Sequence, residues 1–65
     1  MSIAKEIRIY LTKNNISQTW LSEQTGITLT KLNMALNDKR KIPVDEYAKI
    51  VEALNVDANT FIKSK

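Results

Sequence analysis

The sequence predicts an all-α fold of five short helices in one domain, and three observations support this prediction. Apolar residues recur at intervals of three and four, the spacing of one face of an α-helix. The chain has one glycine and one proline, so it lacks the turn residues that β-hairpins need. Its 65 residues are too few for more than one hydrophobic core. We therefore expect a single domain over residues 1–65.

The first predicted helix begins after Ser2, a suitable N-cap, and ends at Asn14 and Asn15. Its apolar face consists of Ile3, Ile7, Tyr10 and Leu11. The second helix begins after Ser17 and runs to about Thr25. Gly26 follows it and supplies the left-handed backbone conformation that ends a helix and is costly for other residues.

The third predicted helix is capped by Thr28 and ends at Asn37 and Asp38, which both tolerate the left-handed conformation. Its buried side consists of Leu32, Ala35 and Leu36.

Pro43 and Asp45 begin the fourth helix, and Asp57 caps a fifth, final short turn. The apolar side of the fourth helix consists of Tyr47, Ile50, Val51 and Leu54. Further residues expected in the core are Ile42, Val44, Val56, Phe61 and Ile62. The alternative for Phe61 or Ile62 is that it contributes to a weak dimer contact instead of the core.

The second and third helices, over about residues 17–36, fit a helix-turn-helix unit joined by a tight glycine turn. Ser22 lies where the two helices cross, a place that requires a small residue. The angle between the helices is filled by Leu21, Ile27, Leu32 and Ala35. Burial of these side chains is expected to hold the pair rigid.

The pattern S-Q-x-x-L-S-x-x-T-G-I-T over residues 17–28, then L-N-M-A-L-N-D-K-R-K over residues 32–41, resembles the phage repressor and Cro helix-turn-helix family. Pro43 and the Leu-Asn-Val ending at residues 54–56 extend the resemblance, which covers about Ile3 to Ile62. It implies a lambda-repressor-like fold of the XRE type of regulator. Three departures are Asp38 where the family has glycine, Leu36 where glutamate is common and Ser22 where alanine is usual.

The resemblance implies that the third helix lies in the major groove of double-stranded DNA. The outward residues expected to contact bases are Thr28, Leu29, Thr30, Lys31, Asn33 and Met34. Asn33 suits a two-bond pair with adenine, and Lys31 suits guanine or a phosphate. Leu29, Thr30 and Met34 suit the thymine methyl group. The alternatives are that Leu29 and Met34 belong to the core and that Asn33 only faces solvent.

The resemblance also implies contacts to phosphates, which position a protein without reading sequence. The residues expected to make them are Ser17, Gln18, Asn37, Lys39, Arg40 and Lys41. Two alternatives stay open: Gln18 caps its own helix, and residues 39–41 form a solvated loop.

Composition restricts the range of possible functions further. The formal net charge is +3, with positive charge gathered at residues 39–41, which favours an anionic partner. There is no cysteine and no histidine, so we expect no metal, no cofactor and no enzymatic activity. No stretch is long and apolar enough to span a bilayer or to form a signal peptide, which favours the cytoplasm.

We expect a small transcriptional regulator that binds a pseudo-palindromic DNA operator as a homodimer, weak in solution and completed on DNA. The chain is then a Cro-like protein or the N-terminal domain of a longer repressor. The alternative is a protein-interaction module of the antitoxin or anti-repressor kind, with Trp20 in its interface, since an exposed tryptophan suits a binding hot spot. Trp20 otherwise packs over a neighbouring helix.

Overall fold

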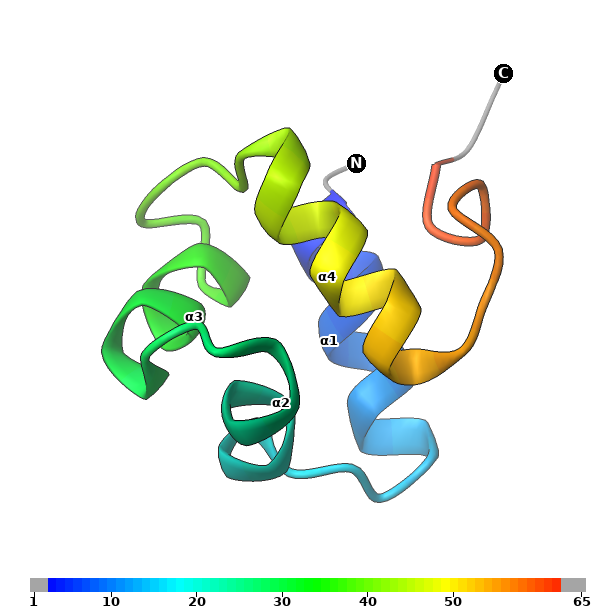
Figure 1. Cartoon of the computed structure of the whole chain (residues 1–65), viewed down its shortest axis with the longest axis horizontal. Coiled ribbons are helices and arrows are strands. Elements are labelled where there is room, and N and C mark those ends of the chain that lie inside the picture. Colours follow the sequence, from blue (N-terminus) through cyan, green and yellow to red (C-terminus); the bar gives the residue numbers. More distant parts are fainter. Residues whose placement is uncertain (1–2, 63–65) are drawn as a thin grey trace.

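The computed structural model describes residues 3–62, which form four helices and no strand (Figure 1). The helices are α1 (Ile3–Lys13), α2 (Gln18–Thr25), α3 (Leu29–Leu36) and α4 (Val44–Leu54). The predicted all-α class is therefore confirmed. Ser2, the expected N-cap of the first helix, lies outside the described residues.

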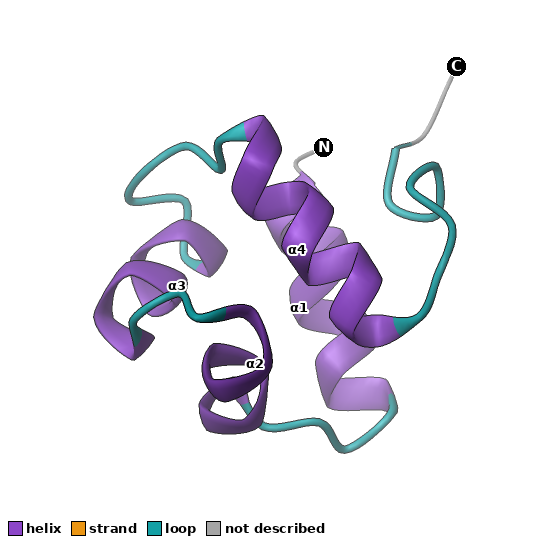
Figure 2. Ribbon diagram, viewed as in Figure 1, coloured by secondary structure: helices purple, strands orange, loops and turns teal. Residues whose placement is uncertain are grey.

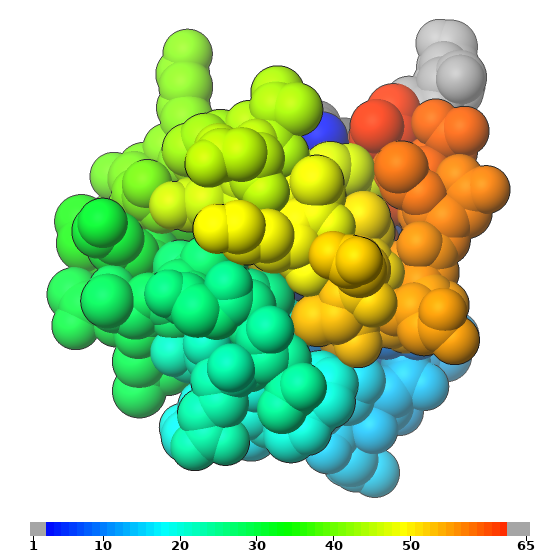
Figure 3. Space-filling view, in the orientation of Figure 1, coloured from blue at the N-terminus to red at the C-terminus, as the bar shows by residue number. Residues whose placement is uncertain are grey.

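The four helices are joined by short loops (Figure 2). α2 packs against both α3 and α4, and α3 packs against α1. In the view of Figure 1, α4 lies in front of α1, while α2 and α3 lie together on one side. The space-filling view shows that α3 forms an outer edge of the molecule, away from the turn that follows α4 (Figure 3).

A single core is shared by all four helices. Its largest fully buried side chains are Ile7, Leu21, Leu32, Leu36 and Ile50. Around them lie further buried residues: Leu11, Ile27, Val51, Leu54 and Phe61. Removing apolar surface from water is worth about 25 cal/mol per Å². Because each helix contributes to the same cluster, burial fixes the helices relative to one another.

Three helices end in the same backbone motif, with Asn15, Asp38 and Asn55 in the left-handed conformation that glycine usually supplies. After α3, the Asp38 N–H donates to the Ala35 carbonyl at 3.2 Å and the Lys39 N–H donates to the Met34 carbonyl at 2.8 Å. This pair of bonds defines the Schellman motif, and equivalent pairs follow α1 and α4. Of the two residues expected to end α3, only Asp38 is left-handed, since Asn37 has φ −103°.

Only α2, within residues 3–62, ends with glycine. Gly26 has φ 79°, and its N–H donates to the Ser22 carbonyl at 2.9 Å. A Cβ atom added at Gly26 would meet nothing within 4 Å. The need for glycine here comes from the backbone conformation alone, as the sequence predicts.

The predicted fifth helix is wrong, because residues 57–62 form successive tight turns. The Thr60 N–H donates to the Asp57 carbonyl at 2.9 Å and the Ile62 N–H donates to the Asn59 carbonyl at 3.2 Å. Both bonds span three residues, and so short a segment cannot offset the cost of nucleating an α-helix.

Side chains of α1 and α4 hold this final segment. The Phe61 ring packs edge-on against Tyr10, with centroids 5.5 Å apart. The Tyr47 hydroxyl donates to the Ala58 carbonyl. Partial burial raises the pKa of Tyr47; a hydrogen bond with the Phe61 backbone opposes this shift and the charge of Asp57 adds to it.

Two residues expected in the core are exposed: Val44 by 85% and Ile62 by 47%. Helical spacing places Val44 on the side of Val51, but the first turn of α4 extends past the edge of the core. Phe61 takes the buried position of the final segment, which leaves Ile62 outside. Ile3 is also exposed, and its neighbour Ala4 is buried. Periodicity identifies the face of a helix but not where the core ends.

Replacement of Gly26 tests the backbone constraint. Gly26→Ala is expected to lower the free energy of unfolding by about 1 kcal/mol, since alanine must adopt a left-handed backbone. Gly26→Asn is expected to cost less than half as much, because asparagine already serves this purpose after α1 and α4. Urea denaturation of both variants measures the difference. Equal losses for alanine and asparagine would contradict the conformational explanation.

Candidate nucleic-acid interface

The turn between α2 and α3 is closed by two hydroxyl groups. Thr25 Oγ1 donates to the Leu21 carbonyl at 2.8 Å and accepts from the Ile27 N–H at 3.2 Å. Ser22 Oγ donates to the Ile27 carbonyl at 2.5 Å. Both backbone polar groups of the buried Ile27 are thus satisfied by side chains of α2. The sequence predicts a small residue at Ser22, but not these hydrogen bonds.

The predicted filling of the angle between α2 and α3 is confirmed, because Leu21, Ile27, Leu32 and Ala35 are all buried. Thr25 is the one buried polar residue among those described, and its hydroxyl has partners. Buried apolar contacts and satisfied backbone groups together make α2 and α3 one rigid unit.

The opposite side of α3 faces solvent. Leu29 is 45% exposed and Met34 is 41% exposed. The other expected base-contacting residues are exposed too: Thr28, Thr30, Lys31 and Asn33. The alternative that Leu29 and Met34 belong to the core is therefore wrong. α3 presents one continuous surface at the edge of the molecule (Figure 3).

A shallow groove of about 480 Å³ runs between this surface and the start of α2. Its lining residues are Gln18, Thr19, Leu29, Thr30, Asn33 and Met34. All of them are uncharged, and Lys31 is the only charged residue of α3. Thr19 was not among the residues expected in the site, although its place beside Gln18 in the first turn of α2 could have indicated it.

Hydroxyl groups cap both helices of the unit, as predicted. Ser17 Oγ accepts from the Trp20 N–H at 3.0 Å, and Thr28 Oγ1 accepts from the Lys31 N–H at 3.3 Å. Because Ser17 caps α2, Gln18 is not needed for that purpose. Its side chain instead reaches across to α3.

Three side-chain amides connect the two helices on the exposed side. Asn33 Nδ2 donates to Gln18 Oε1 at 3.4 Å. Asn37 Nδ2 donates to Asn33 Oδ1 at 3.3 Å and to the Asn33 carbonyl at 2.9 Å. Both ends of the Asn33 amide are therefore engaged within the protein.

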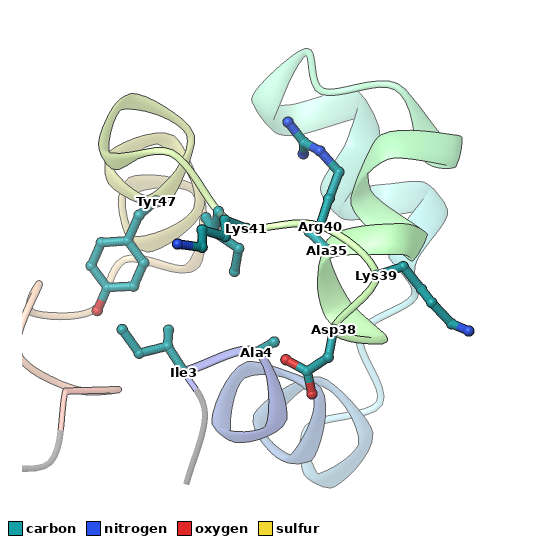
Figure 4. A pocket seen from close by; sticks show the side chains of 9 residues that line it. Ile3, Ala4, Ala35, Asp38, Lys39, Arg40, Lys41 and Tyr47 are labelled. Atoms are coloured by element: carbon teal, nitrogen blue, oxygen red, sulfur yellow. The ribbon is translucent and has the colours of Figure 1, made fainter.

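The basic loop after α3 does not present its three charges as one group. Figure 4 shows Lys41 on the side of Tyr47, with Lys39 and Arg40 pointing away from it in different directions. Arg40 Nη1 lies 2.9 Å from Glu46 Oε1 in the first turn of α4, and both side chains are partly buried. Lys39 and Lys41 are exposed. Glu46 thus offsets the charge of Arg40, which sequence spacing did not indicate.

The same loop borders a groove of about 620 Å³ that also reaches α1 and α4 (Figure 4). Its ionisable lining residues are Asp38, Lys39, Arg40, Lys41 and Tyr47. Within residues 3–62, no cluster of three or more acidic side chains is placed to hold a metal ion. No helix in the same range has the length and apolar character needed to cross a membrane.

Trp20 is 41% exposed. It lines a small hollow with Asn15, Ile16 and Ser17, beside the start of α2. This apolar surface lies outside the groove between α2 and α3.

Comparison with known proteins identifies a family that matches this chain. The pattern of the family described as Helix-turn-helix fits residues 6–61, which includes α2, the Gly26 turn and α3. No curated protein and no solved structure matches the chain.

Removal of the Ser22 hydroxyl tests the turn. Ser22→Ala places the residue usual in repressor-type helix-turn-helix sequences here, yet it leaves the Ile27 carbonyl without its partner. We expect a loss of about 0.5–1 kcal/mol in the free energy of unfolding. Alanine also favours helix by a few tenths of a kcal/mol, and Thr12→Ala on the exposed side of α1 measures that gain separately. A Ser22→Ala protein as stable as Thr12→Ala would show that the hydroxyl does not stabilise the turn.

Proposed function

The chain belongs to the helix-turn-helix family of DNA-binding regulators, and from this premise we propose that it reads a specific double-stranded DNA sequence as a small transcriptional regulator of the Cro or repressor type. The observation that carries the proposal is the exposed outer side of α3 on a rigid helix pair. The major groove of B-DNA is about 12 Å wide and admits an α-helix.

The proposed base contacts are mainly apolar. Leu29, Thr30 and Met34 offer methyl and methylene groups suited to the thymine methyl, which only the major groove presents. Exposure of Leu29 and Met34 costs hydrophobic free energy in the unbound protein, and contact with bases would recover it. Thr28 and Lys31 lie at the start of α3, where Lys31 reaches a guanine or a phosphate.

The proposed phosphate contacts surround this surface. Gln18 flanks it from α2, Ser17 precedes Gln18, and Asn37 ends α3. Lys39 and Lys41 supply exposed positive charge from the following loop. Arg40 contributes less than a free arginine, because Glu46 already neutralises part of its charge.

One helix reads only a few base pairs, so we propose that two copies occupy a pseudo-palindromic operator with half-sites about one helical turn apart. Association in solution is weak and is completed on DNA. Regulation then follows the concentration of the protein and the occupancy of its operator. No small-molecule effector or cofactor enters this proposal.

A second candidate is a protein-interaction module, favoured by the exposure of Trp20 beside Ile16. Tryptophan is enriched among residues that dominate protein interfaces. This candidate explains Trp20, but it gives no role to the groove between α2 and α3.

Salt dependence distinguishes the two candidates. Affinity for duplex DNA is expected to fall with salt, with a log–log slope of about −0.9 for each phosphate neutralised. Lys39→Ala is expected to reduce the magnitude of that slope by about one. Arg40→Ala is expected to reduce it less, because of Glu46. Lys49→Ala, which removes an exposed charge from α4, is the matched control and should leave the slope unchanged.

Fluorescence anisotropy with a duplex selected from a random library provides the measurement, and the selection itself reveals the half-site. Absence of binding to any duplex at low salt would contradict the DNA-binding proposal and favour the interaction module.

A further inference from the structure

We infer that Asn33 and Asn37 are positioning residues, which hold the side chain of Gln18 so that its amide NH₂ group faces a DNA phosphate. The inference rests on the proposed function. It concerns how the free protein orients Gln18 for its contact with a phosphate.

The inference starts from the direction of the hydrogen bonds. Asn37 Nδ2 donates to Asn33 Oδ1, and Asn33 Nδ2 donates in turn to Gln18 Oε1. Asn37 is itself held, since its Nδ2 also donates to the Asn33 carbonyl at 2.9 Å. The three amides thus form a relay that runs from the end of α3 to the start of α2.

The chemistry of the amide explains what the relay achieves. A glutamine side chain offers one accepting oxygen and one donating NH₂ group. The relay uses one lone pair of the Gln18 oxygen from the side of α3 and leaves both hydrogens of the donating Nε2 for an outside partner. Phosphate oxygens only accept hydrogen bonds, and they are the partner that this orientation suits.

The relay also lowers the cost of binding. Glutamine has many rotamers, and fixing it in one costs conformational entropy. When α3 already fixes the Gln18 side chain, less of that cost falls on DNA binding, which is the advantage of preorganisation.

The same bonds bear on the expected contact of Asn33 with adenine. That contact needs both the donor and the acceptor of the amide. Asn33 uses its donor for Gln18 and its acceptor for Asn37. Each end of the amide can form a second hydrogen bond, but these two bonds already fix the direction of the Asn33 side chain towards Gln18 and Asn37, so the geometry favours a role for Asn33 through Gln18.

A double-mutant cycle tests the relay on the selected duplex, with Gln18→Ala, Asn33→Ala and the double variant. A hydrogen bond to a charged group is worth enough for Gln18→Ala to weaken binding by about tenfold or more. Asn33→Ala is expected to weaken binding by about threefold to tenfold, a part of that effect. The double variant should bind no more weakly than Gln18→Ala alone, because Asn33 acts only through Gln18.

Three further readouts test the positioning role of Asn33. Asn33→Ala should leave the preference at every base pair unchanged, and it should leave the salt slope unchanged because the relay is uncharged. In the free protein, Asn33→Ala should shift the side-chain NH₂ resonances of Gln18 and not those of Gln24, an exposed amide elsewhere on α2. Gln24→Ala is the matched control for affinity and should bind as the wild type does.

Three results would overturn the inference. Additive losses in the cycle together with altered preference at one base pair would make Asn33 a base-contacting residue. If Asn33→Ala bound DNA with unchanged affinity, the relay would not orient the Gln18 side chain for phosphate binding. Failure of the wild-type protein to bind any duplex would overturn the proposed function as well, and so differs from the other two results.

Discussion

The fixed angle between α2 and α3 determines which side of α3 faces solvent. A sharp change of chain direction within a small core leaves backbone groups that need hydrogen-bond partners. Gly26 allows the turn, and the hydroxyls of Ser22 and Thr25 satisfy the Ile27 backbone that the turn buries. With Leu21 and Leu32 packed behind it, α3 can expose apolar side chains without being drawn into the core.

The charge of the molecule has a different distribution from that suggested by its sequence. Residues 39–41 form a basic run in the sequence, but in space Arg40 belongs to an ion pair with Glu46, which fastens the loop to α4. The surface of α3 and the adjoining groove carry uncharged side chains, apart from Lys31. In the proposed function, cations beside the groove would then contribute affinity, and apolar and amide groups within it would contribute specificity.

Much of the fold follows from local patterns in the sequence. The N-caps Ser17 and Thr28, the left-handed Gly26 and the outward direction of Leu29 and Met34 each depend on neighbours within one or two turns, so periodicity and capping rules suffice. The exposure of Val44 could not be predicted in this way, because it depends on where other helices stop covering α4. The Arg40–Glu46 pair and the amide relay depend likewise on the spatial approach of separate segments. The fifth helix is missing because residues 57–62 are too few to offset the cost of nucleating an α-helix, which apolar periodicity does not reveal.

In the proposed function, the exposed side of α3 lies against the bases of DNA. Intermolecular nuclear Overhauser contacts, measured on the protein bound to its selected duplex, would detect this arrangement. We expect contacts from the methyl groups of Leu29, Thr30 and Met34 to major-groove base protons, including thymine methyls. Contacts made instead by Trp20 or by the exposed side of α1, with none from α3, would contradict this arrangement.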